Sequence, residues 1–223
     1  PTTTGAPSNP DLCRLITRDP VTQRIIGIDN LNTNVGKEAL SGVDIGLRYA
    51  LPTRALGRFG LTFDGTWLRN HDLTLPTGRV LHGRGTFDLA GQNGNFSGLG
   101  GVNPAWRFNS GVTWARGPLG AGVQTRFIGS FRECGTAAGA FNGGGLCSVD
   151  PTYQRKVSAY ATVDTAVSYT LASVAGATTL TLGVNNLFNA APPSIYNGGQ
   201  DNTDATTYDL VGRFVYGRIT HRL

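Results

Sequence analysis

Methionine is absent from the 223 residues of this chain, charged residues make up only 15% of them, and no long apolar run occurs. Soluble domains average about 25% charged residues, so this chain has few groups with which to cover a hydrated surface. A membrane-spanning helix needs ~20 consecutive apolar residues, and the longest run here is far shorter. A helical membrane protein is therefore excluded. Because a signal peptide is also missing at Pro1, we expect a fragment or a processed product.

Lysine occurs only at Lys37 and Lys156, so the formal net charge of +5 comes almost entirely from arginine. The isoelectric point of about 9.4 would permit nucleic-acid binding, but that requires basic residues gathered on one face. The arginines are instead dispersed along the chain. We expect no nucleic-acid partner and expect the arginines to line a polar interior, paired with Asp44, Asp64 and Asp164.

Cysteine is scarce as well, with three residues. Cys134 and Cys147 bracket a loop rich in glycine and alanine, and their spacing suits a loop disulfide in an oxidising compartment. Cys13 is then left over. Its partner lies upstream of residue 1, or it is a free buried thiol, and both alternatives stay open.

Patterns that carry catalysis are missing too. The only histidines are His71, His82 and His221, and there is no Gly-x-Ser-x-Gly elbow, Walker loop or paired-carboxylate spacing. We therefore expect no enzyme, no metal site and no bound cofactor.

Glycine, in contrast, is abundant, with 32 residues among many threonine, asparagine and aromatic positions. This mixture favours strands and turns over helices. Residues 1–30 are expected to form a loop or rim segment. Alternation of apolar and polar residues predicts seven strands, which span about residues 32–50, 58–69, 104–116, 121–129, 158–171, 177–188 and 207–223.

The connections between these strands alternate between short and long. In outer-membrane barrels the periplasmic turns are short, the outer loops are long, and each strand alternates an outward apolar with an inward polar side chain. We therefore predict an all-β fold, an antiparallel transmembrane β-barrel. A soluble glycan-binding β-sandwich is an alternative, in which the apolar face would be the core.

Seven strands do not make a whole barrel, because single-chain bacterial barrels have even strand numbers and an open edge in lipid leaves backbone groups unpaired. One alternative takes an eighth strand from the first thirty residues and gives a small passive or structural barrel without a plug. The other is the C-terminal part of a larger barrel.

Several short segments carry a more specific signal. They are Cys13 to Asp19, Asn34 to Gly36 followed by Ser41 to Asp44, Tyr160 to Asp164 with Ser168 and Tyr169, Gly183 to Asn189 with Pro192 and Pro193, and Tyr208 to Arg213. In this order they resemble the C-terminal half of the barrel of TonB-dependent outer-membrane receptors. The resemblance implies the last seven strands of a 22-stranded barrel in the Gram-negative outer membrane.

It also implies a function and partners. Such a receptor binds a scarce solute (a siderophore, cobalamin, a saccharide or similar) at its outer loops and imports it with energy transmitted by TonB. TonB would act through an N-terminal part, the plug domain, that these 223 residues lack. Outer-membrane lipid and lipopolysaccharide would surround the wall. Residues nominated for solute contact, because they lie in the long loops, are His71, Phe87, Phe141, Tyr153 and Tyr196.

The final strand of the family ends in Phe or Trp, which the barrel-assembly machinery reads. This chain ends in Leu223 and has His221 where an aromatic residue is common, which implies weaker recognition. The residues expected to form this C-terminal signal are Tyr216, Gly217, Ile219, His221 and Leu223.

Overall fold

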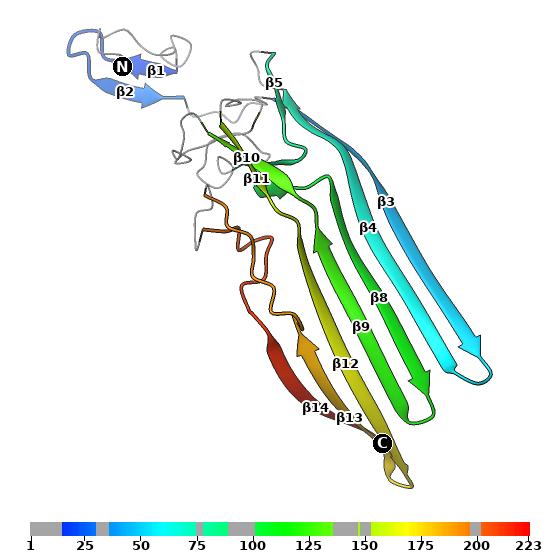
Figure 1. Ribbon diagram of the computed structural model, residues 1–223. Helices are drawn as coiled ribbons and strands as arrows, with labels where there is room; N and C mark the ends of the chain where they lie inside the picture. Colours follow the sequence, from blue (N-terminus) through cyan, green and yellow to red (C-terminus); the bar gives the residue numbers. More distant parts are fainter. Residues whose placement is uncertain are drawn as a thin grey trace. The chain divides into compact units, whose positions relative to one another are not determined.

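The computed structural model describes residues 15–29, 36–74, 78–88, 101–135, 147, 153–196 and 202–223 (Figure 1). The chain divides into two units, Pro1–Val35 and Gly36–Leu223. Within the described ranges, no helix has the length and apolar character needed to cross a membrane.

The first unit contains a two-stranded antiparallel sheet formed by β1 (Ile16–Arg18) and β2 (Ile25–Ile28). The turn between them is stabilised by Asp19, whose carboxylate accepts hydrogen bonds from the backbone N–H groups of Val21 and Thr22. This hairpin occupies part of the stretch expected as a loop or rim segment.

The second unit is built on one long antiparallel sheet, in which each strand pairs with its neighbours along the chain (Figure 1). Its long strands are β3 (Lys37–Thr53), β4 (Gly57–Thr74), β8 (Trp106–Arg116), β9 (Leu119–Ile128), β12 (Tyr160–Ser173), β13 (Gly176–Asn185) and β14 (Phe214–Arg222). A short strand, β5 (Val80–His82), also pairs with β4. In the described ranges the sheet keeps two edges, β3 and β14, and does not close.

Three short turns join the strands in pairs at one end of the sheet. They connect β3 to β4, β8 to β9 and β12 to β13. Gly176 takes a φ of +122°, and a Cβ there would lie 2.3 Å from the carbonyl oxygen of Arg222. Glycine is therefore required at this turn by both its conformation and its neighbour.

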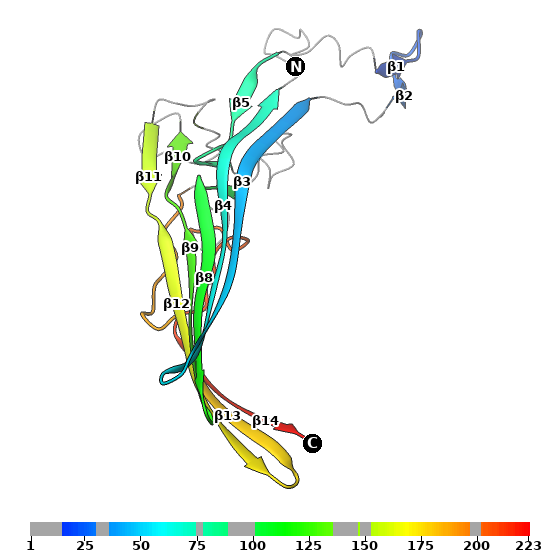
Figure 2. The same cartoon turned by 90° about the vertical axis from the view of Figure 1, so that its right-hand side faces the viewer.

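The long sheet forms a curved wall (Figure 2). The strand register sorts its side chains onto two faces. One, the apolar face, includes Val43, Ile45, Leu47, Leu61, Val112, Val123, Val167, Leu182, Val215 and Ile219. Their exposed fractions run from 37% for Leu61 to 75% for Ile219, so nothing in the described ranges packs on them as a second sheet would. The β-sandwich alternative is therefore wrong.

The opposite face is polar and carries charges of both signs. It includes Asp44, Arg48, Asp64, Arg107, Asn109, Gln124, Arg126, Asp164 and Arg218. Arg48 and Asp64 form an ion pair at 3.0 Å. An antiparallel sheet with one apolar and one charged face is the wall expected of a transmembrane barrel.

A smaller four-stranded sheet lies beyond the end of the wall opposite the short turns (Figure 1). Its order is β11 (Tyr153–Val157), β10 (Phe131–Gly135), β6 (Thr86–Asp88) and β7 (Gly101–Asn103). Phe87, Phe131 and Val157 of this sheet belong to the one cluster of buried apolar residues found in the described ranges, with Ile128, Tyr160, Ile195 and Tyr208. In the described ranges, apolar burial is thus concentrated around the small sheet, while the wall is a single layer.

Residues 69–103 and 129–156 were expected to be loops, but both contain strands. The first stretch contains β5, β6 and β7, and the second contains β10 and β11. In addition, β4 continues into the first stretch as far as Thr74. The continuation depends on a β-bulge, because Ser41 pairs with Asn70 but Gly42 pairs with Leu68. The extra residue in β4 shifts the alternation of inward and outward side chains by one position. The residues beyond Leu68 are also mostly polar, so a search for alternating apolar and polar residues does not detect this part of the strand.

The last strand is shorter than expected and begins at Phe214 instead of residue 207. The preceding residues turn locally, since Asp209 accepts a hydrogen bond from the N–H of Val211 at 2.9 Å. The carbonyl oxygen of Asp204 accepts another from the N–H of Tyr208 at 2.9 Å. Aspartate side chains that bind nearby backbone groups favour turns over strands.

Candidate functional site

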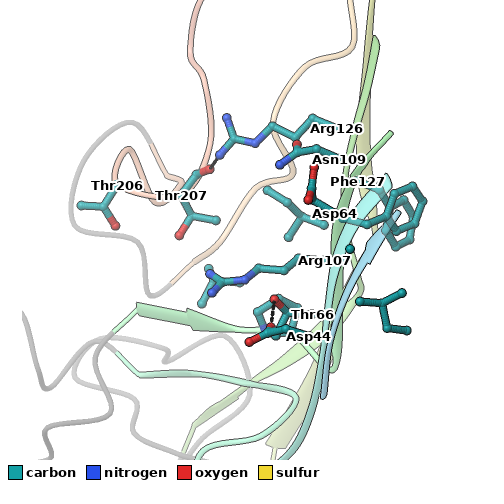
Figure 3. Close-up of a pocket in the computed structure, with 16 residues that line it drawn as sticks. Asp44, Asp64, Thr66, Arg107, Asn109, Arg126, Phe127, Thr206 and Thr207 are labelled. Carbon is teal, nitrogen blue, oxygen red and sulfur yellow. Dashed lines mark hydrogen bonds between the residues drawn. The ribbon is translucent and has the colours of Figure 1, made fainter. Parts of the chain in front are cut away.

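A cavity of about 590 Å³ lies against the polar face, where four wall strands meet the turn at residues 206–207 (Figure 3). Arg107 and Asn109 come from β8 and Arg126 comes from β9, at alternate positions that point the same way. Figure 3 shows the two arginines extending toward the cavity, while Phe127 points to the other side of the sheet. The period of two thus supplies the polar lining.

Hydrogen bonds fix the two sides of this cavity. Arg126 donates to the carbonyl oxygen of Thr207 at 2.9 Å, which ties the last loop to the wall. Thr66 donates to a carboxylate oxygen of Asp44 at 2.7 Å. Arg107 makes no hydrogen bond or ion pair with any residue of the described ranges, so its guanidinium can receive a polar or anionic group.

A second cavity of about 380 Å³ lies beside Arg126 and is lined by Tyr160 and Asp209, among others. Tyr160 packs edge-on against Tyr208, with ring centroids 5.2 Å apart. The hydroxyl groups of both tyrosines are buried without a partner in the described part of the chain. Burial, with a further contribution from Asp204, raises the pKa of Tyr208 above its usual value, so its hydroxyl remains protonated at neutral pH.

A network centred on Arg155 joins two of the long loops. Its Nε donates to the carboxylate of Glu133, which is fully buried, at 2.5 Å. A terminal nitrogen of Arg155 donates to the carbonyl oxygen of Ser194, and the guanidinium lies 4.0 Å from the ring centroid of Tyr196. Arg155 therefore satisfies a buried charge and holds two loops in contact.

A family model described as the TonB dependent receptor-like β-barrel matches residues 13–187. The match covers most of the wall and agrees with its antiparallel strands and apolar outer face. The chain belongs to the TonB-dependent receptor β-barrel family. These receptors are transporters of the Gram-negative outer membrane and are not enzymes. Neither the search of curated proteins nor the search of solved structures gave a match.

This assignment orients the wall in its membrane. The short turns of the receptor lie on the periplasmic side, and the cavity and the small sheet lie toward the outer side. The polar face therefore lines the lumen, and the apolar face contacts lipid.

Two of the nominated residues lie near the outer end of β4 and in the small sheet. The side chain of His71 is 12% exposed, with Nε2 2.6 Å from Glu38 and Nδ1 3.0 Å from Asn103. Phe87 is 1% exposed and packs in the buried cluster beside Phe131. Both side chains are therefore engaged with the receptor itself.

Tyr153 and Tyr196 are the more accessible nominees, with exposed fractions of 37% and 55%. Tyr153 begins β11, and Tyr196 lies against Arg155. Phe141 lies outside the described residues. The sequence reasoning did not nominate Arg107, Arg126 or Arg155 as site residues. The alternation of apolar and polar residues along β8 and β9 could have identified Arg107 and Arg126 on the polar face. No local sequence pattern marks Arg155.

The C-terminal residues divide between the two faces of β14. Tyr216 lies opposite Gly183 on the lumen face, whereas Gly217 and Ile219 lie on the lipid face. His221 follows on the lipid face, where its Nδ1 is 2.9 Å from the hydroxyl of Thr178. Leu223 is fully exposed at the end of the chain.

Cys134 and Cys147 are joined by a disulfide, with their Cα atoms 5.0 Å apart. Cys134 is completely buried next to Glu133, so the bond ties residue 147 to the small sheet. We expect the Cys134→Ser/Cys147→Ser double variant to lose about 3 kcal/mol of loop stability, because the opened loop gains conformational entropy.

The measurement is limited proteolysis of the receptor in intact outer membranes. The variant should be cleaved between residues 136 and 152 while the wild type resists, and adding a reductant should make the wild type behave like the variant. Equal cleavage of both proteins would show that the disulfide does not stabilise this loop.

Proposed function

We propose that this chain is the C-terminal wall and loop region of an active-transport receptor that captures a scarce solute at its outer loops and imports it with energy from TonB. TonB would act through parts of the receptor outside residues 1–223. The observation that carries the proposal is the polar cavity on the lumen face, covered by the ordered turn at residues 206–207, in a barrel of this family.

The chemistry of the cavity supports capture of a polar solute with acceptor groups. Arg107 is a cation without a described partner, and Asn109 and Thr206 add neutral hydrogen-bonding groups beside it. Charge-assisted hydrogen bonds from a guanidinium are strong where water is partly excluded. Tyr153 and Tyr196 are exposed loop residues whose rings would add apolar contact area, while Phe87 is buried and packs against Phe131.

The test is uptake of labelled ferric siderophores, cobalamin and oligosaccharides by cells that carry the intact receptor, cells without it, and cells without TonB. Uptake of one solute should fall to background in both deletion strains. Uptake that needs the receptor but persists without TonB would instead indicate a passive barrel.

The role of Arg107 is tested in the same assay with the variant Arg107→Gln. We expect the apparent affinity for the solute to fall about tenfold for the arginine variant, the loss typical of a hydrogen bond to a charged group. Arg116→Gln, at the periplasmic end of the same strand, is the matched control and should transport normally. An unchanged affinity in the Arg107→Gln variant would remove this residue from the site.

A further inference from the structure

The strand register brings side chains from four neighbouring strands of the lumen face to the second cavity. Arg126 of β9 lies opposite Thr162 of β12. Asp164 follows Thr162 by two positions and therefore points to the same face. Asn185, at the end of β13, lies opposite Phe214 of β14. These side chains all line the cavity of about 380 Å³, a volume within the usual range of small-molecule sites.

Backbone donors hold the two carboxylates of this cavity in place. The N–H of Asn186 donates to Oδ1 of Asp164 at 2.7 Å, and the N–H of Val211 donates to Oδ1 of Asp209 at 2.9 Å. The pairing of Asp164 with an arginine, expected from the sequence, is not found among the described residues. Within those ranges, the second oxygen of each carboxylate accepts no hydrogen bond, so both oxygens are available as acceptors.

Arg126 places a donor beside these acceptors. One terminal nitrogen of its guanidinium donates to the carbonyl oxygen of Thr207, and its other N–H groups make no hydrogen bond in the part of the chain that the structure describes. A cationic solute would be attracted by the carboxylates but repelled by the guanidinium, and an anionic solute would meet the reverse. A hydroxyl group both donates and accepts, so a solute rich in hydroxyl groups suits both kinds of lining group.

Phe214 adds an aromatic surface to this polar lining. Its ring is 53% exposed on the lumen face and stacks against Tyr216, with ring centroids 6.4 Å apart. The face of an aromatic ring carries the negative part of its quadrupole, which attracts C–H groups with partial positive charge. A pyranose ring presents such C–H groups on its face and hydroxyl groups around its edge, so it matches both parts of the cavity.

We propose that the second cavity is a saccharide subsite and that the transported solute is an oligosaccharide. Phe214 stacks on a pyranose ring, Asp164 and Asp209 accept hydrogen bonds from its hydroxyl groups, and Arg126 donates to them. The inference rests on the proposed function, because it names the class of solute that the same receptor takes up.

The experiment is a binding screen of the purified intact receptor on an array of defined oligosaccharides. It is followed by titration calorimetry with the oligosaccharide that binds best and with its fully O-methylated form. The methylated sugar keeps its rings and acceptor oxygens but has no hydroxyl donors. The wild type should bind it about tenfold more weakly, because the hydrogen bonds to the two carboxylates are lost.

Substitutions in the lining test each contact by the same titration. Asp164→Asn keeps an oxygen that can accept from Asn186 and should weaken binding about tenfold, the loss of a hydrogen bond to a charged group. Phe214→Leu should weaken binding about fivefold, whereas Phe214→Tyr keeps the ring and should bind like the wild type. Arg218→Gln, on the lumen face of β14 outside both cavities, is the matched control and should also bind normally.

Three results would each overturn the proposal: no binding to any oligosaccharide of the array, equal binding of the methylated sugar, or unchanged affinity in both Asp164→Asn and Phe214→Leu. The uptake assay separates this failure from failure of the proposed function. TonB-dependent uptake of a ferric siderophore or cobalamin, without oligosaccharide binding, would remove the saccharide subsite and leave active transport in place. Oligosaccharide binding with uptake that persists without TonB would support the subsite and contradict active transport.

Discussion

The Val123→Arg variant should lose about 2 to 4 kcal/mol of unfolding free energy, the cost of a cation at the middle of a barrel's lipid face. Val123 is the central outward residue of β9, between Val112 and Thr165 on the neighbouring strands, and is 44% exposed. The measurement is urea unfolding of the receptor in lipid vesicles. A guanidinium at this depth is hydrated only if the side chain bends toward the interface or the bilayer thins locally, and both are costly.

The adjacent Gln124→Arg variant is the matched control. Gln124 lies on the lumen face opposite Asp164, so an arginine there remains hydrated near an opposite charge. Its unfolding free energy should stay within about 0.5 kcal/mol of the wild type, as for most surface substitutions. If the two variants lose equal stability, the assignment of lipid and lumen faces is wrong.

The Gly176→Val variant should reach the outer membrane poorly and lose about 3 kcal/mol or more where it does assemble. At φ +122° a branched side chain is strained, and its Cβ would meet the carbonyl oxygen of Arg222. A backbone atom cannot rotate away as a side chain can, so β14 must separate from β13. Folding is measured by the shift in gel mobility between heated and unheated samples.

Gly117 gives the comparison, because it occupies an equivalent turn with a φ of +57° and has no neighbour within 4 Å of an added Cβ. Asparagine tolerates this conformation, so Gly117→Asn should assemble normally. Normal assembly of Gly176→Val would mean that the turn can reorganise without its glycine.

The wall was predictable from the sequence because each strand repeats one physical rule. In β8, Trp106 and Phe108 alternate with Arg107 and Asn109, and the structure places these pairs on opposite faces. A period of two follows from strand geometry alone, so it can be recognised without knowing the neighbouring strands. The family match agrees with this interpretation.

The outer region was less predictable because its contacts join residues distant in the sequence. The bulge opposite Ser41 reverses the faces of β4 before His71, and nothing local to that stretch reveals it. Phe87 was nominated for solute contact because it lies in a long loop, but it is buried against Phe131, which follows more than forty positions later. Whether an aromatic loop residue packs or binds depends on such partners.

The contacts of Arg155 also couple two of the outer loops. Glu133 is fully buried, so separating the loop of Ser194 and Tyr196 from the small sheet would weaken the contacts that accommodate its charge. Leaving a buried charge unpaired is costly. The two loops are thus coupled through Arg155, and any displacement of one of them would strain its contacts with the other.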